Sequence, residues 1–348
     1  IKGQLGGEAT KRFLAAVEKN TVRLQSPSDQ LLLLELIGAD KPTPFALSQV
    51  QPLLSSGQAE VRAAAHQVAR RWGPEGSILA VAIWPRLLAQ NATSKPSMKL
   101  EERLQMSITL AAIEKEPARE EWTRLLADAD PVLARDLVRS WRAYADKPEM
   151  TKVLGENSKG LLARDPALAA DLGAVLQHLK LPLPEKVAPP SPAEMEDDSL
   201  LKHVLAMPIA EKPENQVALG RRVFERAGCV KCHTTVSENS LRAPTLKGIG
   251  AAQKTEYFVE SILQPSKVIK TGFEIEAIVT TSGKQHNGLV KDEKENLRII
   301  TPDAEITLPK SEIESRAVQK KSLMPDGLKQ LITPDELRDL VAYLKSLK

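Results

Sequence analysis

The feature that most limits the fold of this chain is a proline-dense segment just past its middle. It contains five prolines: Pro182, Pro184, Pro189, Pro190 and Pro192. A proline fixes its own φ angle, lacks an N–H and disfavours helical geometry in the preceding residue, so no helix can run through this segment. We predict a semi-rigid, extended linker over residues 181–198, which separates one domain over residues 1–180 from a second over residues 199–348.

The first domain is expected to consist of helices throughout. Apolar residues recur at helical spacing from Glu8 to about Lys180, with Pro or Gly between the periodic stretches. The expected helices span residues 8–24, 28–38, 44–55, 58–72, 75–90, 98–115, 118–128, 131–145, 148–162 and 166–179. Ser28 and Asp130 are expected to cap two of them. Residues 52–65, and more weakly 125–135, resemble HEAT-like repeats, whose helix pairs bury their apolar faces only by stacking. This favours an α-solenoid; a generic helical bundle is the alternative.

Composition excludes several classes of protein. The 348 residues are 42% hydrophobic and 27% charged, which provides ample material for apolar cores. A net charge of +3 and only 3% aromatic residues argue against a nucleic-acid-binding surface. No apolar run approaches the ~20 residues of a membrane-spanning helix. Both cysteines fall in one short motif, which excludes a scaffold of several disulfides.

That motif is Cys229-Val230-Lys231-Cys232-His233, which has the spacing of a c-type haem attachment signal. Two thiols one short turn apart can both add to the vinyl groups of a porphyrin, and the adjacent imidazole can bind the iron through Nε2. The alternatives are a redox Cys-x-x-Cys pair and half of a zinc site. The first needs a surrounding βαβ pattern and the second needs further ligands, and the sequence offers neither. We predict one covalent haem c on Cys229, Cys232 and His233.

Beyond the motif, the chain resembles class I c-type cytochromes. In that family a Gly and a Phe on the N-terminal helix cross an aliphatic and an aromatic residue on the C-terminal helix. Gly220 and Phe224 match the first pair, and Leu340 and Tyr343 match the second, on a final helix expected over residues 333–347. Glycine lacks a Cβ and so permits a close helix crossing.

The resemblance also implies two further residues of the haem site. Ala243-Pro244-Thr245-Leu246 is similar to the family's Gly-Pro-x-Leu segment, with Ala in place of Gly, and it implies that the Pro244 carbonyl accepts the Nδ1–H of His233. Met324, in the Met-Pro pair before the final helix, is implied as the sixth ligand of the iron. His286 is the first alternative ligand, and His203 and Met207 are weaker ones. His66 and His178 are interpreted as surface or core residues of the helical domain.

The stretch between His233 and Met324 is longer than compact members of the family need. Residues 273–280 alternate apolar and polar side chains up to a Ser-Gly turn, which is typical of a strand. Further strands are expected at 284–290, 296–301 and 304–308. We therefore predict an antiparallel meander of three to four strands, inserted at about residues 272–309.

This combination resembles the haem-binding domain found at the C-terminus of large secreted proteins of planctomycetes and verrucomicrobia. The resemblance covers about residues 214–348. It rests on Ile262-Leu263-Gln264-Pro265-Ser266, Gly272-Phe273-Glu274, Gly288-Leu289-Val290 and Ser322-Leu323-Met324-Pro325. HEAT-like repeats often precede that domain, and a propeller dehydrogenase domain can stand further upstream. Because Ile1 is not an initiator methionine, we expect the chain to be part of a larger precursor.

The expected function is electron transfer by a monohaem cytochrome c module on a helical-repeat scaffold, and not catalysis. A haem enzyme or gas sensor with an open sixth position is one alternative, and a helical adaptor for a protein partner is another. Nine Lys or Arg against four Asp or Glu between Arg221 and Lys270 favour an acidic redox partner. Haem c is attached outside the cytoplasm, so the resemblance implies a periplasmic or exported location, and electrons would come from a fused or partner dehydrogenase.

Overall fold

A computed structural model describes residues 7–19, 21–91, 98–114, 118–184, 187, 196–206, 213–235 and 242–348. The chain is mainly helical and carries one small antiparallel sheet, as the sequence predicted at this coarse level. It divides into two compact units, Ile1–Leu168 with Val175–Pro184, and Ala169–Ala174 with Glu185–Lys348. None of the helices in the described ranges is long and apolar enough to cross a membrane.

The first unit contains helices α1 to α9, with three short 3₁₀ segments, and α10 is shared between the units. The helices are α1 (Gly7–Glu18), α2 (Pro27–Ile37), α3 (Pro44–Leu53), α4 (Ala59–Trp72), α5 (Ala80–Asn91), α6 (Leu100–Ile113), α7 (Arg119–Asp128), α8 (Pro131–Ser140), α9 (Pro148–Arg164) and α10 (Ala169–His178). The 3₁₀ segments are η1 (Gly73–Leu79), η2 (Trp141–Tyr144) and η3 (Pro166–Leu168). They occupy parts of the helices predicted at 75–90, 131–145 and 166–179, so those predictions were too long.

One of the two predicted caps is correct. Asp130 caps α8, because its carboxylate accepts hydrogen bonds from the backbone N–H groups of Val132 and Leu133. The cap of α2 is Ser26 and not Ser28: the Ser26 hydroxyl accepts the N–H of Asp29, whose carboxylate accepts the N–H of Ser26. This reciprocal pair satisfies two N–H groups that the helix start leaves open.

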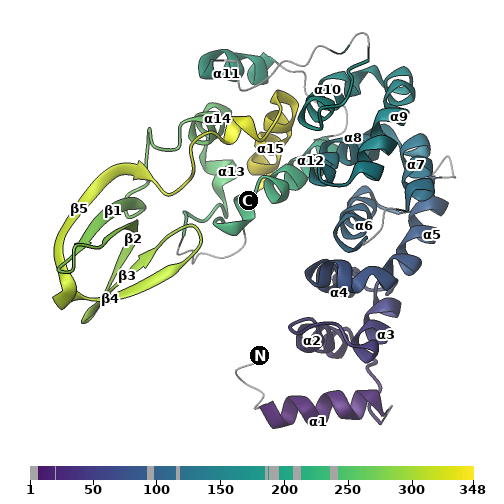
Figure 1. The fold of residues 1–348 in the computed structure, drawn as a ribbon, viewed down its shortest axis with the longest axis horizontal. Coiled ribbons are helices and arrows are strands. Elements are labelled where there is room, and N and C mark those ends of the chain that lie inside the picture. Colours follow the sequence, from purple (N-terminus) through teal and green to yellow (C-terminus); the bar gives the residue numbers. More distant parts are fainter. Residues whose placement is uncertain are drawn as a thin grey trace. The chain divides into compact units, whose positions relative to one another are not determined.

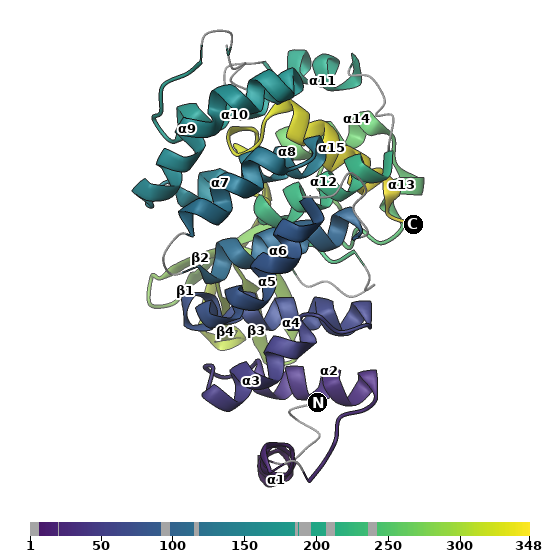
Figure 2. The ribbon, with the colours of Figure 1, turned by 90° about the vertical axis from the view of Figure 1, so that its right-hand side faces the viewer.

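The helices of the first unit form two rows. Helices α2, α4, α6 and α8 pack in series in one row, and α5, α7 and α9 pack in series in the other (Figures 1 and 2). Helix α3 contacts α4, and α5 contacts α6, so the rows lie against each other. Within each row, a helix thus packs on the helix two positions further along the chain.

The same two-helix step appears in the hydrogen bonds that close helix C-termini. The last carbonyls of a helix have no partner within it, and a basic side chain is well suited to bind them. In three places an arginine donates to a carbonyl at the C-terminal end of the helix two positions earlier in the chain. The bonds run from Arg71 Nη1 to Gly38 O (2.8 Å), from Arg86 Nη1 to Leu54 O (2.8 Å) and from Arg164 Nη2 to Leu126 O (2.7 Å).

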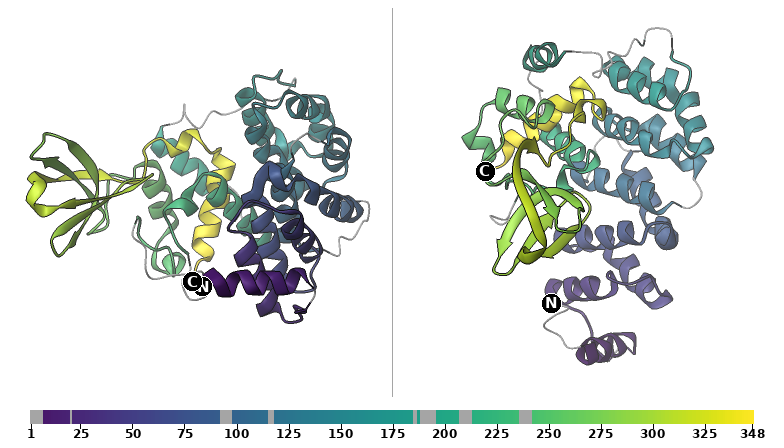
Figure 3. Two further views of the ribbon diagram at one scale, coloured as in Figure 1. Left: turned by 60° about the horizontal axis from the view of Figure 1, so that its bottom comes forward. Right: turned by 60° about the vertical axis from the view of Figure 1, so that its left-hand side comes forward.

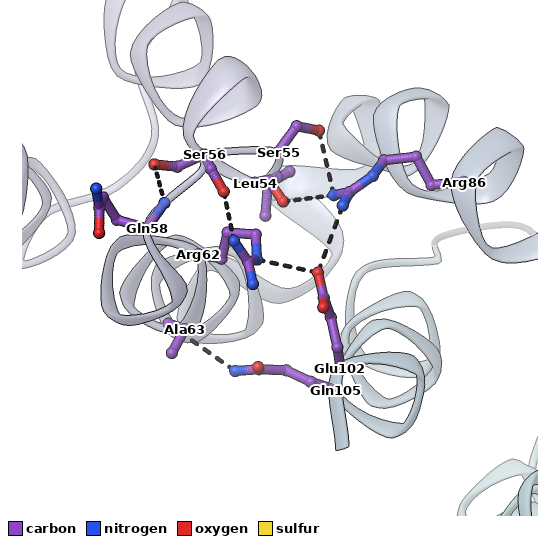
Figure 4. Close-up of polar contacts among 9 residues, drawn as sticks. All are labelled: Leu54, Ser55, Ser56, Gln58, Arg62, Ala63, Arg86, Glu102 and Gln105. Atoms are coloured by element: carbon purple, nitrogen blue, oxygen red, sulfur yellow. Dashed lines mark hydrogen bonds and ion pairs between the residues drawn. The ribbon is translucent and has the colours of Figure 1, made fainter. Parts of the chain in front are cut away.

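The carboxylate of Glu102, on α6, forms ion pairs with Arg62 of α4 and with Arg86 of α5 (Figure 4). Glu102 Oε1 lies 2.9 Å from Arg62 Nε and 3.4 Å from Arg86 Nη2. Arg62 also donates to the carbonyl of Ser56 (2.6 Å), and Arg86 also donates to the hydroxyl of Ser55 (3.2 Å). The loop after α3 is therefore held by Arg62 of α4 and Arg86 of α5, and Glu102 of α6 binds both arginines.

The core of the first unit includes a cluster of aromatic rings. Trp84, Trp122 and Trp141 meet edge to face, with ring centroids 5.1 Å and 5.4 Å apart, and Tyr144 packs beside the last two. The Trp84 Nε1–H donates to Glu114 Oε1 at 2.6 Å, and burial raises the pKa of that carboxyl. The rings tie α5, α7 and η2 together across the two rows.

The second unit contains α11 (Asp197–Ala206), α12 (Pro213–Arg226), η5 (Cys229–Lys231), α13 (Ile249–Ala252), α14 (Thr255–Leu263), η7 (Leu328–Gln330) and α15 (Pro334–Ser346). Helices α12 and α15 correspond to the two predicted helices, whereas α11, α13 and α14 were not predicted. The predicted linker lies largely outside the described residues, and α11 begins within its last positions.

Helices α12 and α15 cross at Gly220 (Figure 1). A Cβ placed on Gly220 would overlap the carbonyl oxygen of Asp339 and lie 2.8 Å from the Cβ of Tyr343, so only glycine fits there. The rings of Phe224 and Tyr343 pack with centroids 5.5 Å apart, and Leu340 is buried at the same crossing. The structure thus contains the crossing expected from these four residues.

The sheet has five strands in the order β4-β3-β2-β1-β5, all antiparallel (Figures 1 and 3). The strands are β1 (Glu274–Thr280), β2 (Gln285–Glu293), β3 (Asn296–Ile300), β4 (Glu305–Pro309) and β5 (Ile313–Ser322). The first four match the predicted strands. The prediction of three to four strands was nevertheless short by one, because β5 lies beyond residue 309 and pairs with β1.

Candidate functional site

The two cysteines and His233 lie on one tight turn that follows α12. Gly228 ends the helix with φ +81°, a conformation that favours glycine, and η5 begins at the next residue. The N–H of Cys232 donates to the carbonyl of Cys229 at 3.2 Å, and the N–H of His233 donates to the same carbonyl at 2.9 Å. This turn holds the three side chains of the motif together.

His233 has a defined partner in the loop before α13. Its Nδ1 lies 2.9 Å from the carbonyl oxygen of Pro244. A carbonyl can only accept a hydrogen bond, so Nδ1 carries the proton and Nε2 of the neutral ring keeps a lone pair. Burial lowers the pKa of His233, and the bond to Pro244 opposes that shift in part. At neutral pH the side chain is therefore a nitrogen donor fixed in one tautomer.

A cavity of about 480 Å³ opens beside this turn, within the second unit. Its lining is mostly apolar and comes from α13, α14 and α15 and from the loops before α13 and after α14, and it includes His233, Cys229, Pro244 and Met324. A largely apolar cavity of this size with a few fixed polar atoms is typical of a ligand or cofactor site. The structure therefore brings four of the five predicted site residues to one cavity, and Cys232 lies on the turn beside it.

Met324 reaches the cavity from the end of the sheet. It follows β5 by two residues, it is half-buried, and it packs against the core of the second unit. Its backbone N–H donates to the hydroxyl of Ser322 at 3.1 Å. The thioether sulfur is a soft donor, so the cavity has an imidazole nitrogen and a thioether sulfur among its lining groups.

The other candidate ligands are placed elsewhere or are not described. His286 is buried within the sheet, opposite Ile278, and does not line the cavity. His203 is exposed on α11, and Met207 lies outside the described residues. In the first unit His66 is buried, while His178 at the end of α10 is exposed, so they are core and surface residues as interpreted.

The state of the cysteines discriminates between the alternatives for the motif. Burial raises the pKa of the Cys229 thiol to about 11, whereas thiols that exchange disulfides have a lowered pKa. The redox Cys-x-x-Cys alternative is thus disfavoured. Within the ranges that the structure describes, no three His, Cys, Asp or Glu side chains are grouped so that they could hold a metal ion.

Several residues of the site were not identified from the sequence. Arg242 lines the cavity and donates to the carbonyls of Thr301 (2.6 Å) and Pro302 (3.0 Å), which ties the loop before Pro244 to the turn between β3 and β4. Phe273 lines the cavity at the start of β1. The strand alternation begins at Phe273 and could have indicated it, whereas the partners of Arg242 are too distant in sequence to leave a local signal.

Comparison with known proteins gives no match, either among protein-family models or among curated proteins. The interpretation of the site therefore depends on its own residues and their geometry.

Proposed function

We propose that the second unit binds one haem c covalently through Cys229 and Cys232, that His233 and Met324 would hold its iron, and that the unit carries electrons. The observation that supports this most directly is the Cys-x-x-Cys-His turn beside a cavity that His233 and Met324 both line. The bond from His233 to Pro244 adds to it, because it leaves Nε2 as the free donor nitrogen.

The residues present fit such a group. The cavity is mostly apolar, which suits a porphyrin face, and its lining includes a thiol, an imidazole and a thioether. Bound haem would supply a one-electron Fe(III)/Fe(II) couple. The chain's own residues would bind and orient it, keep His233 in one tautomer and exclude water with side chains such as Phe258, Ile262 and Leu344.

Two features favour electron transfer over catalysis: Met324 lines the cavity, and His286 does not. A haem enzyme needs an open sixth position and acid–base groups near it. His286, the first alternative to Met324 as a ligand, is also the histidine considered for acid–base chemistry. It is 8% exposed within the sheet and does not line the cavity. Met324, which lines the cavity, would occupy the iron position that a haem enzyme keeps open. We therefore propose an electron carrier and no substrate chemistry.

The wider architecture is proposed as a HEAT-like α-solenoid followed by a class I cytochrome c domain with a β insertion. The two rows of helices, and the arginines that bind the C-termini of helices two positions back, support the repeat interpretation of the first unit. The Gly220 crossing supports the cytochrome interpretation of the second. An adaptor role for the repeats stays a prediction.

An acidic redox partner is proposed for the cavity mouth. Lys270 lines the cavity and is exposed, and Lys231 and Lys254 are exposed on the neighbouring segments. Positive charge at this position would raise the encounter rate with an acidic protein, and the rate would fall as ionic strength rises. The upstream dehydrogenase and the extracytoplasmic location stay predictions.

Covalent attachment is tested by expressing the full chain with a haem c maturation system. Acid–acetone extraction of the denatured protein should leave the colour on the polypeptide, because thioether bonds survive it. The double variant Cys229→Ala/Cys232→Ala should lose its haem to the solvent. Release of all haem from the unmodified chain would refute the proposal. In the same preparation, the oxidised protein should show the weak far-red band of thioether–iron ligation, and Met324→Ala should abolish it.

A further inference from the structure

The backbone of Met324 is held by a chain of two serines. Ser266 lies in the loop after α14, and its hydroxyl accepts the backbone N–H of Ser322 at 3.2 Å. The hydroxyl of Ser322 in turn accepts the backbone N–H of Met324 at 3.1 Å. Both serines are half-buried. The position of Met324 is thus connected by hydrogen bonds to the loop after α14, which also lines the cavity.

The residue between Ser322 and Met324 anchors the same segment in the sheet. Leu323 packs with Phe273 against the buried side chains of Ile275, Leu289 and Ile300. Leu323 and Phe273 also line the cavity. This small apolar cluster therefore belongs both to the sheet and to the wall of the cavity.

The strand that leads to Met324 is irregular just before it. Glu276 pairs with Val318, but Glu274 pairs with Ser322, so β5 contains more residues than β1 over this stretch. Such bulges bend a strand and redirect the side chains that follow, and they are frequent beside functional sites. Here the irregularity lies immediately before Ser322 and the turn to Met324.

We propose that Ser322 and Ser266 are positioning residues for Met324, and that the five-stranded sheet serves to hold this methionine on the iron. The inference rests on the proposed function and assigns a role to the inserted sheet. Ile275, Leu289 and Ile300, on β1, β2 and β3, supply the apolar anchor on which Leu323 packs, and the two hydroxyls fix the backbone beside it. Without them the thioether would spend more time away from the metal.

The test uses the full, haem-loaded chain and the variants Ser322→Ala, Ser266→Ala and Ser322→Thr. The readouts are the intensity of the far-red thioether–iron band in the oxidised protein and carbon monoxide binding to the reduced protein. A lost hydrogen bond is expected to increase the population with Met324 detached by roughly two- to tenfold, with a matching gain in carbon monoxide affinity. Ser322→Thr keeps the hydroxyl and should restore most of the band. Ser315→Ala, at an exposed serine on the same strand, is the matched control and should leave both readouts unchanged.

The outcomes separate this inference from the function on which it rests. Absence of covalent haem or of the far-red band in the unmodified chain would refute the proposed function. An intact band in the unmodified chain together with unchanged readouts in both alanine variants would refute only the positioning role. If Ser322→Ala does not retain haem, the far-red band and carbon monoxide binding are measured in Ser266→Ala, because Ser266 lies outside β5 and its substitution leaves the strand sequence unchanged. An equal effect of Ser315→Ala would also overturn the inference.

Discussion

At the scale of single residues, Gly220 shows how one side chain sets the distance between two helices. A Cβ on this residue would overlap the carbonyl oxygen of Asp339, which belongs to the backbone of α15 and cannot move alone. We expect Gly220→Ala to push α12 away from α15 and to lower the free energy of unfolding of the second unit by about 1–3 kcal/mol. Urea unfolding, followed by circular dichroism, measures this change.

Gly160 is the matched control, since it is also a helical glycine. A Cβ on Gly160, in α9, would meet nothing within 4 Å. Gly160→Ala should therefore stabilise the first unit by about 0.5–1 kcal/mol, because alanine loses less backbone entropy in a helix. Similar destabilisation by both substitutions would show that the tight crossing is not the cause.

His66 should make the first unit sensitive to acid. Its side chain is 1% exposed, its Nδ1 lies 3.0 Å from the hydroxyl of Thr109, and burial, with Arg70, Arg86 and Arg62 nearby, lowers its pKa to about 3. In the unfolded chain the histidine takes up a proton near pH 6.5, so below that pH the unfolded state binds more protons than the folded state.

The expected result is a loss of stability as the pH falls from about 6.5 towards 3, amounting to about 3 kcal/mol at pH 4 from this residue alone. The free energy of unfolding, measured in urea at several pH values, should fall less steeply over this range in His66→Gln than in the unmodified chain. His178→Gln changes an exposed histidine and should keep the original pH dependence. Equal slopes for His66→Gln and the unmodified chain would contradict the argument.

At the scale of elements, the arginines at helix C-termini should contribute to the stability of the first unit. Arg71 on α4 donates to the carbonyl of Gly38, the C-cap residue of α2, at 2.8 Å. Arg71→Met keeps much of the aliphatic stem but removes the donor, so we expect a loss of about 1 kcal/mol. Arg124→Met, at an exposed position on α7, is expected to change stability by less than about 0.5 kcal/mol. The midpoints of urea unfolding compare the two, and a larger effect at Arg124 would argue against the capping role.

The strands show what local patterns can predict and what they cannot. β1 was located from its alternation, and β2 to β4 from the turn residues between them. In β1 the more buried face carries Glu276 and Ile278 and is not the face that was predicted to be apolar. β5 was missed because most of its side chains on both faces are exposed, so its sequence has no period of two. Its pairing with β1 is a tertiary effect. The same applies to Ser322 and Arg242, whose partners Ser266 and Thr301 lie more than fifty residues away.

The residues with a chemical motif were the easiest to locate. Cys229, Cys232 and His233 follow one another at a spacing with few uses, and Met324 was implied by a resemblance to a family. The structure shows, in addition, that His233 and Met324 line the same cavity. Residues of helices α13 and α14 form part of the wall of this cavity. These helices are short and their apolar pattern is correspondingly weak, so sequence alone did not reveal the wall of the site.

At the scale of the whole molecule, the second unit includes a segment from before the predicted linker. Ala169–Ala174 group with Glu185–Lys348, and within that unit the hydroxyl of Thr333 donates to Asp171 Oδ1 at 3.2 Å. Asp171 is fully buried, and Thr333 is the N-cap of α15, the helix that crosses α12. The first turn of α10 is therefore connected with the start of the last helix.

A chain of residues 169–348 should accordingly be more stable than one of residues 175–348, which keeps the proline-dense segment and lacks only this turn. Loss of the hydrogen bond to Asp171, together with removal of the buried side chain of Leu172, should lower the free energy of unfolding by about 1–3 kcal/mol. In the full chain, Asp171→Ala should lower the stability of the second unit in the same direction. Equal midpoints for the chains starting at 169 and 175 would mean that the first turn of α10 adds nothing to the stability of the second unit.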